Sequence, residues 1–283
     1  MKNPEVVWWA YLGLGNEDQS PDNPLFDYRL LAEGDSWFSL GGIPTSNLLF
    51  SMKFHHNVII VSCSSPGDTI THMGEIAKNN YLKKAMSRKY GYEWDAILLS
   101  GGGNDLIDNT GEIIFKPRKA SQDPAAYCHE DQILQTLDYI EDGYRRIAEL
   151  RDSPGSSCMR KPIITHTYDW VTPRNSPARF LSLPLAGPWL YRAMVTAKIP
   201  ESLWIPISDY LVSRLRDRIK SLASGSNAIP DFYVVITENV LQRASTVSTG
   251  NDGDWLNEIH PNHKGYEKIA SKISRKVRKL IGD

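Results

Sequence analysis

Five short apolar runs, separated from one another by helical patterning, constrain the fold of this chain more than any other feature. They span residues 28–32, 57–61, 96–99, 162–165 and 232–236. Runs of this length that are rich in β-branched residues are typical of strands buried on both faces of a sheet. Strands that alternate with helices form a parallel sheet, because each helix carries the chain back across it. The sequence therefore predicts an α/β fold.

Three segments have apolar residues spaced three and four positions apart, which places them along one face of a helix. These segments span residues 133–147, 211–222 and 266–280. The chain has 283 residues, of which 41% are hydrophobic, so it can bury one large core. We expect residues 1–283 to form a single domain.

Two stretches fall outside the alternation. Residues 1–27 form an N-terminal extension with an apolar run at 6–14, but Glu5 offsets Lys2 and no small-residue cleavage site follows. We therefore expect a packed or edge segment there and not a secretory signal. Residues 170–206 contain six prolines and several aromatic residues. Such a long insertion is either a pocket wall near the active site or an ordinary packed excursion.

Composition narrows the classes of partner. Lys and Arg number 32 against 33 Asp and Glu, so the chain lacks the basic excess of a nucleic-acid-binding protein. No stretch approaches the ~18–20 apolar residues of a membrane-spanning helix. The three cysteines include no Cys-x-x-Cys pair and are too few for a disulfide framework. We expect a cytoplasmic protein without a nucleic-acid partner, and the oligomeric state stays open.

Polar blocks follow the first and third predicted strands and precede the last predicted helix. They are Gly34-Asp35-Ser36, Gly102-Gly103-Asn104-Asp105 and Asn257-Glu258-Ile259-His260-Pro261. Ligands of open α/β sheets bind beyond the carboxyl ends of the strands, where these blocks would meet. A serine nucleophile needs a nearby base, which histidine supplies, and the oxyanion that forms needs fixed donors. The blocks carry one group of each kind.

In this order the blocks resemble the SGNH (GDSL-type) hydrolase family, with Gly67 as a loose match to its second block. The sequence Asn-Glu-Ile-His-Pro resembles a bacterial subgroup of that family. The resemblance implies a flavodoxin-like three-layer α/β/α sandwich with five parallel strands in the order 2-1-3-4-5. It further implies lipase- or esterase-like cleavage of carboxylic esters, a small-molecule ester as the partner, and neither cofactor nor metal.

The resemblance also assigns roles by position. Ser36 is the nucleophile and His260 the general base. The oxyanion hole consists of the backbone amides of Ser36 and Gly67 and the side-chain amide of Asn104. His166 and Trp189 are candidate substrate contacts, although a purely structural role for His166 is equally open.

One position departs from the family. Asn257 stands three residues before His260, where the family usually has aspartate. An asparagine oxygen that faces the ring can orient a histidine, whereas a misoriented amide favours the wrong tautomer. Asp254, Glu258 or a backbone carbonyl are alternative partners for the ring. If His260 is unsupported, the alternative is a non-catalytic or weakly active ligand-binding module on the same fold.

Overall fold

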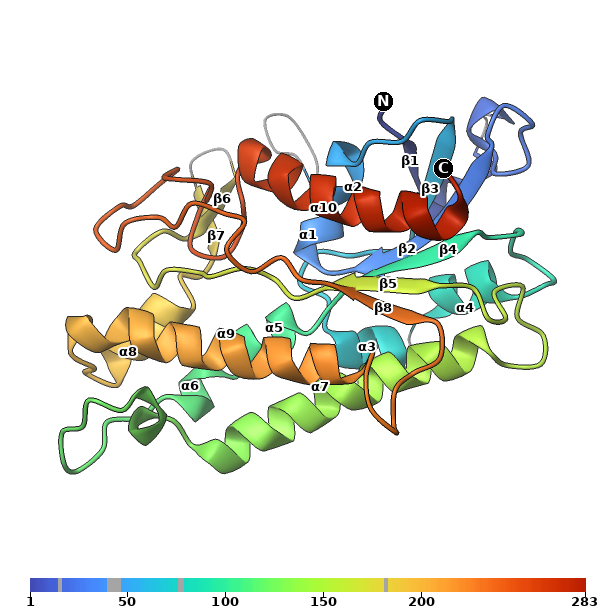
Figure 1. Cartoon of the computed structure of the whole chain (residues 1–283). Helices are drawn as coiled ribbons and strands as arrows, with labels where there is room; N and C mark the ends of the chain where they lie inside the picture. Colours follow the sequence, from blue (N-terminus) through green and yellow to red (C-terminus); the bar gives the residue numbers. More distant parts are fainter. Residues whose placement is uncertain (15–16, 40–46, 76–78, 181–182) are drawn as a thin grey trace.

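A parallel sheet runs through the middle of the molecule in the computed structural model, which describes residues 1–14, 17–39, 47–75, 79–180 and 183–283. Six strands are hydrogen-bonded in the order β1-β3-β2-β4-β5-β8 (Figure 1). They are β1 (Glu5–Trp8), β2 (Tyr28–Gly34), β3 (Val58–Ser62), β4 (Ala96–Ser100), β5 (Ile163–His166) and β8 (Phe232–Val235). Each of the five predicted runs forms a strand, and their relative order is 2-1-3-4-5 as expected.

The sixth strand, β1, corrects the expected strand number. It lies in the N-terminal stretch and pairs in parallel with β3, from Glu5 opposite Ile59 to Trp8 opposite Ser62. Val6 and Val7 are buried in this strand. The apolar run at 6–14 hides the strand in the sequence, because only the first part of the run reaches β3 and the rest turns away as the 3₁₀ helix η1 (Trp9–Tyr11).

Helices cover both faces of the sheet and complete a three-layer sandwich (Figure 1). One face carries α1 (Ser36–Ser39), α2 (Leu48–Ser51) and the long α10 (His263–Ile281). The other carries α3 (Ile70–Gly74), α7 (Glu130–Arg151) and α9 (Trp204–Ser221). The three helices predicted from periodicity are α7, α9 and α10, and the residues that define their stripes are buried or partly buried. Every residue of β3 and β4 is buried, as expected of strands covered on both faces.

The remaining elements are short. They are η2 (Glu17–Gln19), α4 (Asn80–Met86), α5 (Gly103–Asp108), α6 (Thr110–Ile113), η3 (Pro124–Tyr127), β6 (Ala178–Phe180), β7 (Leu183–Ala186), α8 (Leu190–Thr196) and η4 (Glu201–Leu203). Where the structure describes it, the insertion at 170–206 is therefore folded, and β6 and β7 pair as an antiparallel hairpin. This hairpin and α8 lie beyond the carboxyl ends of the strands (Figure 1).

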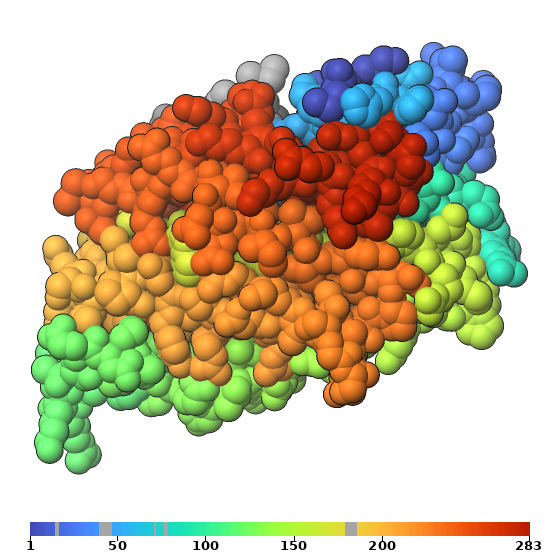
Figure 2. Space-filling model, viewed as in Figure 1, coloured from blue at the N-terminus to red at the C-terminus, as the bar shows by residue number. Residues whose placement is uncertain are grey.

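The segment between α6 and η3 projects from the body as an exposed arm, green in Figure 2. Within the part of the chain that the structure describes, no helix is both long and apolar enough to cross a membrane.

The carboxyl ends of β2 and β4 are paired, with Gly34 opposite Ser100. A Cβ at Gly34 would lie 2.9 Å from the Phe38 ring and 3.0 Å from the carbonyl oxygen of Ser100. The amide of Asp35 donates to that carbonyl at 2.9 Å. Only glycine fits at position 34 without displacing its neighbours. The close contact of Gly34 with Ser100 places Ser36, two residues later, at the carboxyl-end edge of the sheet.

Candidate active site

Ser36 begins helix α1 directly after β2, and Asp35 holds it there. Oδ1 of Asp35 accepts the amide of Trp37 at 3.0 Å, and its backbone carbonyl accepts the amides of Phe38 and Ser39. This is the capping role that aspartate plays at helix starts. Ser36 is nearly buried, with 5% of its surface exposed.

His260 reaches Ser36 from the far end of the chain. Its Nε2 lies 2.7 Å from the Ser36 hydroxyl oxygen, although 224 residues separate the two. Two anchors fix the loop that carries His260: its carbonyl accepts the amide of Leu256 at 2.8 Å, and Pro261 bridges to Trp255. The distance lies within the range over which a base can take the proton of a nucleophile.

The side-chain oxygen of Asn257 orients the imidazole. Oδ1 lies 3.0 Å from Nδ1 of His260 and accepts the backbone amides of Ile259 at 3.1 Å and His260 at 2.9 Å. Because a backbone N–H can only donate, the atom facing these amides must be the oxygen and not the amide nitrogen. Nδ1 therefore carries the hydrogen, and Nε2 presents its lone pair to the Ser36 hydroxyl.

Neither carboxylate that the sequence offered as an alternative contacts the ring. Asp254 pairs with Lys268 and accepts the amide of Gln242 at 2.6 Å. Glu258 turns toward the insertion at 170–206, where it accepts the amides of Trp189 and, at 2.7 Å, Tyr191. Within the turn at 257–260 it is Asn257 whose side chain points back toward His260. Asp254 and Glu258, the two alternative partners for the ring, are therefore corrected by the structure.

Burial sets the protonation states at this site. It lowers the pKa of His260 to about 4, because the charged imidazolium is poorly solvated there. The ring is neutral at pH 7, as a general base must be. Burial has the opposite effect on Glu258 and raises the pKa of its carboxyl to about 7.

The three predicted oxyanion donors belong to segments that are tied together. The amide of Ser65 donates to the carbonyl of Gly34 at 3.2 Å, which anchors the turn at 65–68 to the end of β2. Gly67 has a φ of 78° in this turn, a conformation that favours glycine. Nδ2 of Asn104 donates to the carbonyl of Asp68 at 2.9 Å, so the amide is held to the turn that carries Gly67.

Two hollows adjoin the site. A cavity of about 40 Å³ is bordered by Ser36 and Asn104. A larger groove of about 590 Å³ is bordered by Trp189, whose ring meets the His260 ring edge-on at a centroid distance of 6.1 Å. Trp189 thus lies beside the imidazole, as a residue that contacts substrate would.

His166 is part of the core. Its Nε2 lies 3.0 Å from the hydroxyl oxygen of Ser100, and its ring stacks on Trp37 at a centroid distance of 5.3 Å. Only 1% of its surface is exposed, and burial lowers its pKa to about 3. Of the two roles left open for His166, these contacts favour the structural one, because the ring lies beneath α1 with both nitrogens facing protein groups.

A buried network behind Ser36 was missed by the sequence analysis. The carboxylate of Asp35 accepts the hydroxyls of Tyr168 at 2.5 Å and Ser100 at 2.8 Å. Burial raises the pKa of Asp35 to about 6. A Cβ at Gly103 would lie 2.8 Å from the Tyr168 ring, so the glycine makes room for this tyrosine. The available signals were that Tyr168 follows a predicted strand, as Ser36 does, and that residues 165–169 resemble the same bacterial subgroup.

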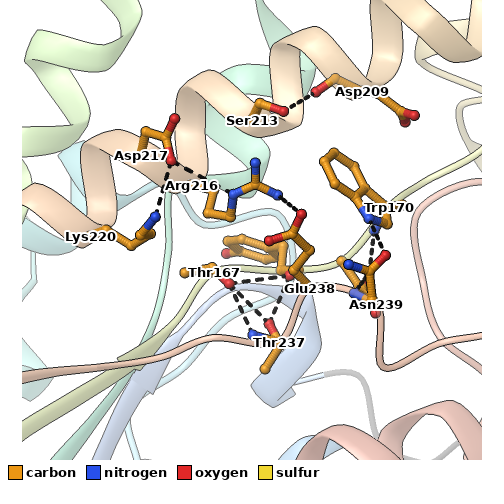
Figure 3. A network of polar contacts seen from close by, with 12 residues as sticks. Thr167, Trp170, Asp209, Ser213, Arg216, Asp217, Lys220, Thr237, Glu238 and Asn239 are labelled. Carbon is orange, nitrogen blue, oxygen red and sulfur yellow. Dashed lines mark hydrogen bonds and ion pairs between the residues drawn. The ribbon is translucent and has the colours of Figure 1, made fainter.

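The segment after β5 is anchored on its outer side by a second network (Figure 3). Nε1 of Trp170 donates to Asn239 at 2.9 Å, and the guanidinium of Arg216 lies 4.7 Å from the Trp170 ring centroid. Arg216 also pairs with Glu238 at 2.6 Å. The network joins α9 to the loop after β8 and fixes the chain that leads from Tyr168.

Metal-ligating side chains do not gather near this site. Across the residues described, no group of three or more His, Cys, Asp or Glu side chains is arranged to hold a metal ion.

Comparison with known proteins identifies the family. The sequence profile described as GDSL-like Lipase/Acylhydrolase matches residues 43–273, well over half of the chain. The chain therefore belongs to this family of acylhydrolases, and it is a hydrolase of esters in that general sense. The match begins after Ser36. No curated protein has a sequence that matches this chain.

Solved structures with a similar course of the chain are distant in sequence. A carbohydrate acetylesterase from Sinorhizobium meliloti is 12% identical, with a TM-score of 0.47 over 89% of this chain and 99% of that one. An extracellular lipase from Streptomyces rimosus is 12% identical, with a TM-score of 0.45 over 89% and 98%. An aryl esterase from M. smegmatis is 14% identical, with a TM-score of 0.44 over 89% and 99%.

Proposed function

We propose that this protein is a serine hydrolase that cleaves carboxylic esters through an acyl-enzyme. One observation carries the proposal: the Ser36 hydroxyl lies 2.7 Å from Nε2 of His260, while Asn257 holds Nδ1 of the same ring. This arrangement has the nucleophile, base and orienting group of a catalytic triad, with a neutral amide in place of the usual carboxylate.

The first half of the reaction forms the acyl-enzyme. Ser36 Oγ attacks the carbonyl carbon of the ester, and its proton passes to Nε2 of His260. The oxygen that becomes negative accepts N–H groups from Ser36, Gly67 and Asn104. The tetrahedral intermediate then breaks its bond to the alcohol oxygen, which takes the proton from His260 and leaves as the alcohol.

The second half regenerates the enzyme. Water attacks the acyl-serine and gives a proton to His260, and the carboxylic acid departs as that proton returns to Ser36 Oγ. In both halves the Nδ1–H group of His260 stays hydrogen-bonded to the side-chain oxygen of Asn257. The neutral amide orients the ring but offers the cation less electrostatic stabilisation than a carboxylate would.

A serine-directed fluorophosphonate probe tests the nucleophile. We expect rapid labelling of the wild type, none of Ser36→Ala, and normal labelling of Ser39→Ala. Ser39 is a matched control because it is a buried serine of the same helix whose hydroxyl donates to the Asp35 carbonyl at 2.9 Å. Labelling that persists in Ser36→Ala contradicts the proposal. Folded wild type that is not labelled favours a non-catalytic ligand-binding module instead.

We also propose that residues 1–283 act as one domain and that the protein works in the cytoplasm. In support of one domain, strands from residue 5 to residue 235 share a single sheet, and the site joins residue 36 to residue 260. In support of the cytoplasm, Cys63, Cys128 and Cys158 are buried free thiols, which suit a reducing compartment.

A further inference from the structure

The small cavity at Ser36 has an apolar wall built from segments far apart in the chain. Ser36 and Asn104 border it on one side. Val171 and, from helix α9, Val212 and Leu215 border it as well. Each of these three side chains is buried, with exposed fractions of 6%, 7% and 2%. The cavity therefore suits a hydrocarbon group attached to a carbon that Ser36 attacks.

The volume of the cavity limits the length of that group. A space of about 10–15 Å³ on this measure holds one water-sized group, so about three such groups fit in a cavity of about 40 Å³. A methyl or methylene group is somewhat larger than water. The cavity thus accommodates the acyl part of an acetyl or propionyl ester, and a chain of six carbons exceeds it.

The position of His260 decides which part of the ester enters the cavity. His260 must give its proton to the departing alcohol oxygen, so the alcohol lies on the side of the imidazole. On that side Trp189 meets the ring, and Trp189 borders the groove of about 590 Å³. Ile107 borders both hollows, so the two lie side by side. The alcohol part of the substrate therefore extends into the groove, and the acyl part points into the cavity.

Polar contacts brace the wall of the cavity against expansion. Asp169 borders the cavity, and its carboxylate accepts the backbone amides of Trp170, Asn239, Val240 and Leu241 at 2.7–2.9 Å. Helix α9 is held to the same loop by Arg216, which pairs with Glu238 and packs on Trp170 (Figure 3). The segment that carries Asp169 and helix α9, which both border the cavity, are thus held to the loop after β8. We therefore expect the cavity to resist widening for a longer acyl chain.

We propose that this site is selective for short acyl groups, acetyl and propionyl, esterified to a larger alcohol that lies in the Trp189 groove. This proposal rests on the proposed function, since it assumes that Ser36 attacks the ester carbonyl. It goes beyond that function by naming the acyl class and the residues that limit it.

The test compares p-nitrophenyl acetate, propionate, butyrate, hexanoate and octanoate, which differ only in the acyl chain. We expect kcat/KM of the wild type to fall about tenfold or more from propionate to hexanoate, because a methylene that does not fit costs at least that much. Val212→Ala enlarges the cavity and should raise the hexanoate-to-acetate ratio about tenfold. Val212→Leu fills the cavity and should depress propionate relative to acetate.

Val277→Ala is the matched control, because it makes the same truncation at a buried valine of helix α10. It should keep the wild-type chain-length profile. Thermal melting of each variant separates a change in selectivity from a loss of fold, and Val212→Leu still tests the cavity if Val212→Ala unfolds.

The outcomes are distinct. A wild-type profile that is flat or rises toward octanoate overturns the acyl cavity and leaves the esterase function in place. A profile shift of equal size in Val277→Ala also overturns it. No turnover of any ester by folded wild type, together with no fluorophosphonate labelling, overturns the esterase function and the acyl cavity with it.

Discussion

Replacing Asn257 with aspartate should raise the pH at which activity is lost in acid. The two side chains have nearly the same shape, so the new carboxylate oxygen would occupy the place of Oδ1, 3.0 Å from Nδ1 of His260. It could also accept the backbone amides of Ile259 and His260 that Asn257 accepts now. The substitution therefore adds one negative charge beside the imidazole without removing a hydrogen bond.

The size of the shift follows from the burial of the ring. Burial holds the pKa of His260 at about 4 in the wild type. An opposite charge at this distance raises a pKa by about 1–3 units, which corresponds to ~1.4–4 kcal/mol of stabilisation of the imidazolium. Protonated His260 cannot take the Ser36 proton, so activity is lost below the pKa. The acid limb should move from about pH 4 to about pH 5–7.

The assay is kcat/KM for p-nitrophenyl acetate between pH 3 and 8, with detection at a wavelength where the phenol and phenolate absorb equally. At pH values above the acid limb, Asn257→Asp should raise kcat/KM more for esters with poor leaving groups than for p-nitrophenyl esters. Esters with poor leaving groups depend more on proton donation by the protonated imidazole. Asn239→Asp is the control, since it adds the same charge at an asparagine that contacts Trp170 and not His260. If the acid limb stays at its wild-type position, or moves equally in the control, a charge at position 257 does not control the pKa of His260 and the prediction is wrong.

Three further predictions concern the dyad, the oxyanion donor and a buried carboxyl. Ser36→Ala and His260→Ala should each remove most esterase activity, and the double variant should be little worse, because the two side chains serve one step; losses that multiply would show independent roles. Asn104→Ala should lower kcat by roughly 10²–10³ with little change in KM, and an effect on KM alone would assign Asn104 to substrate binding. Burial raises the pKa of Glu33 to about 8, although its carboxylate accepts Asn79 at 2.8 Å and the amide of Gly34 at 2.9 Å. The native state therefore keeps a proton that the unfolded chain loses above pH 4.5, so this contribution to stability is complete below pH 4.5 and is lost as the pH rises to about 8. Urea denaturation at pH 5 and pH 8 should show a fall in unfolding free energy that is smaller in Glu33→Gln by roughly 3–4 kcal/mol; an equal fall in both proteins would show that Glu33 ionises normally.

Local patterning was enough to predict most of the secondary structure. Strands β3, β4 and β5 are buried along their whole length, so their apolar runs are continuous, and the stripes of α7, α9 and α10 follow from the period of the helix. Ser36 and His260 could be proposed as site residues because each lies in a short block beside a strand end or a helix start. These features depend on residues a few positions apart, which a single sequence displays.

The structure of the site depended on contacts that no local pattern encodes. Residues 5–8 form a strand because they reach the edge of β3. Asn257 supports His260 because two backbone amides of its own turn fix which atom of the amide faces the ring. Glu258, one position later, faces away into the insertion, and His166 is buried under Trp37.

The amino-acid sequence was therefore enough to predict the α/β architecture and to propose Ser36 and His260 as nucleophile and base, because periodicity and short motifs are properties of neighbouring residues. Only the tertiary structure decided the partner of the imidazole, the burial that lowers its pKa, and the cavity beside Ser36. That cavity is enclosed by α1, α5, the segment after β5 and α9. Its volume is what remains when these distant segments pack together, and so it depends on the whole fold.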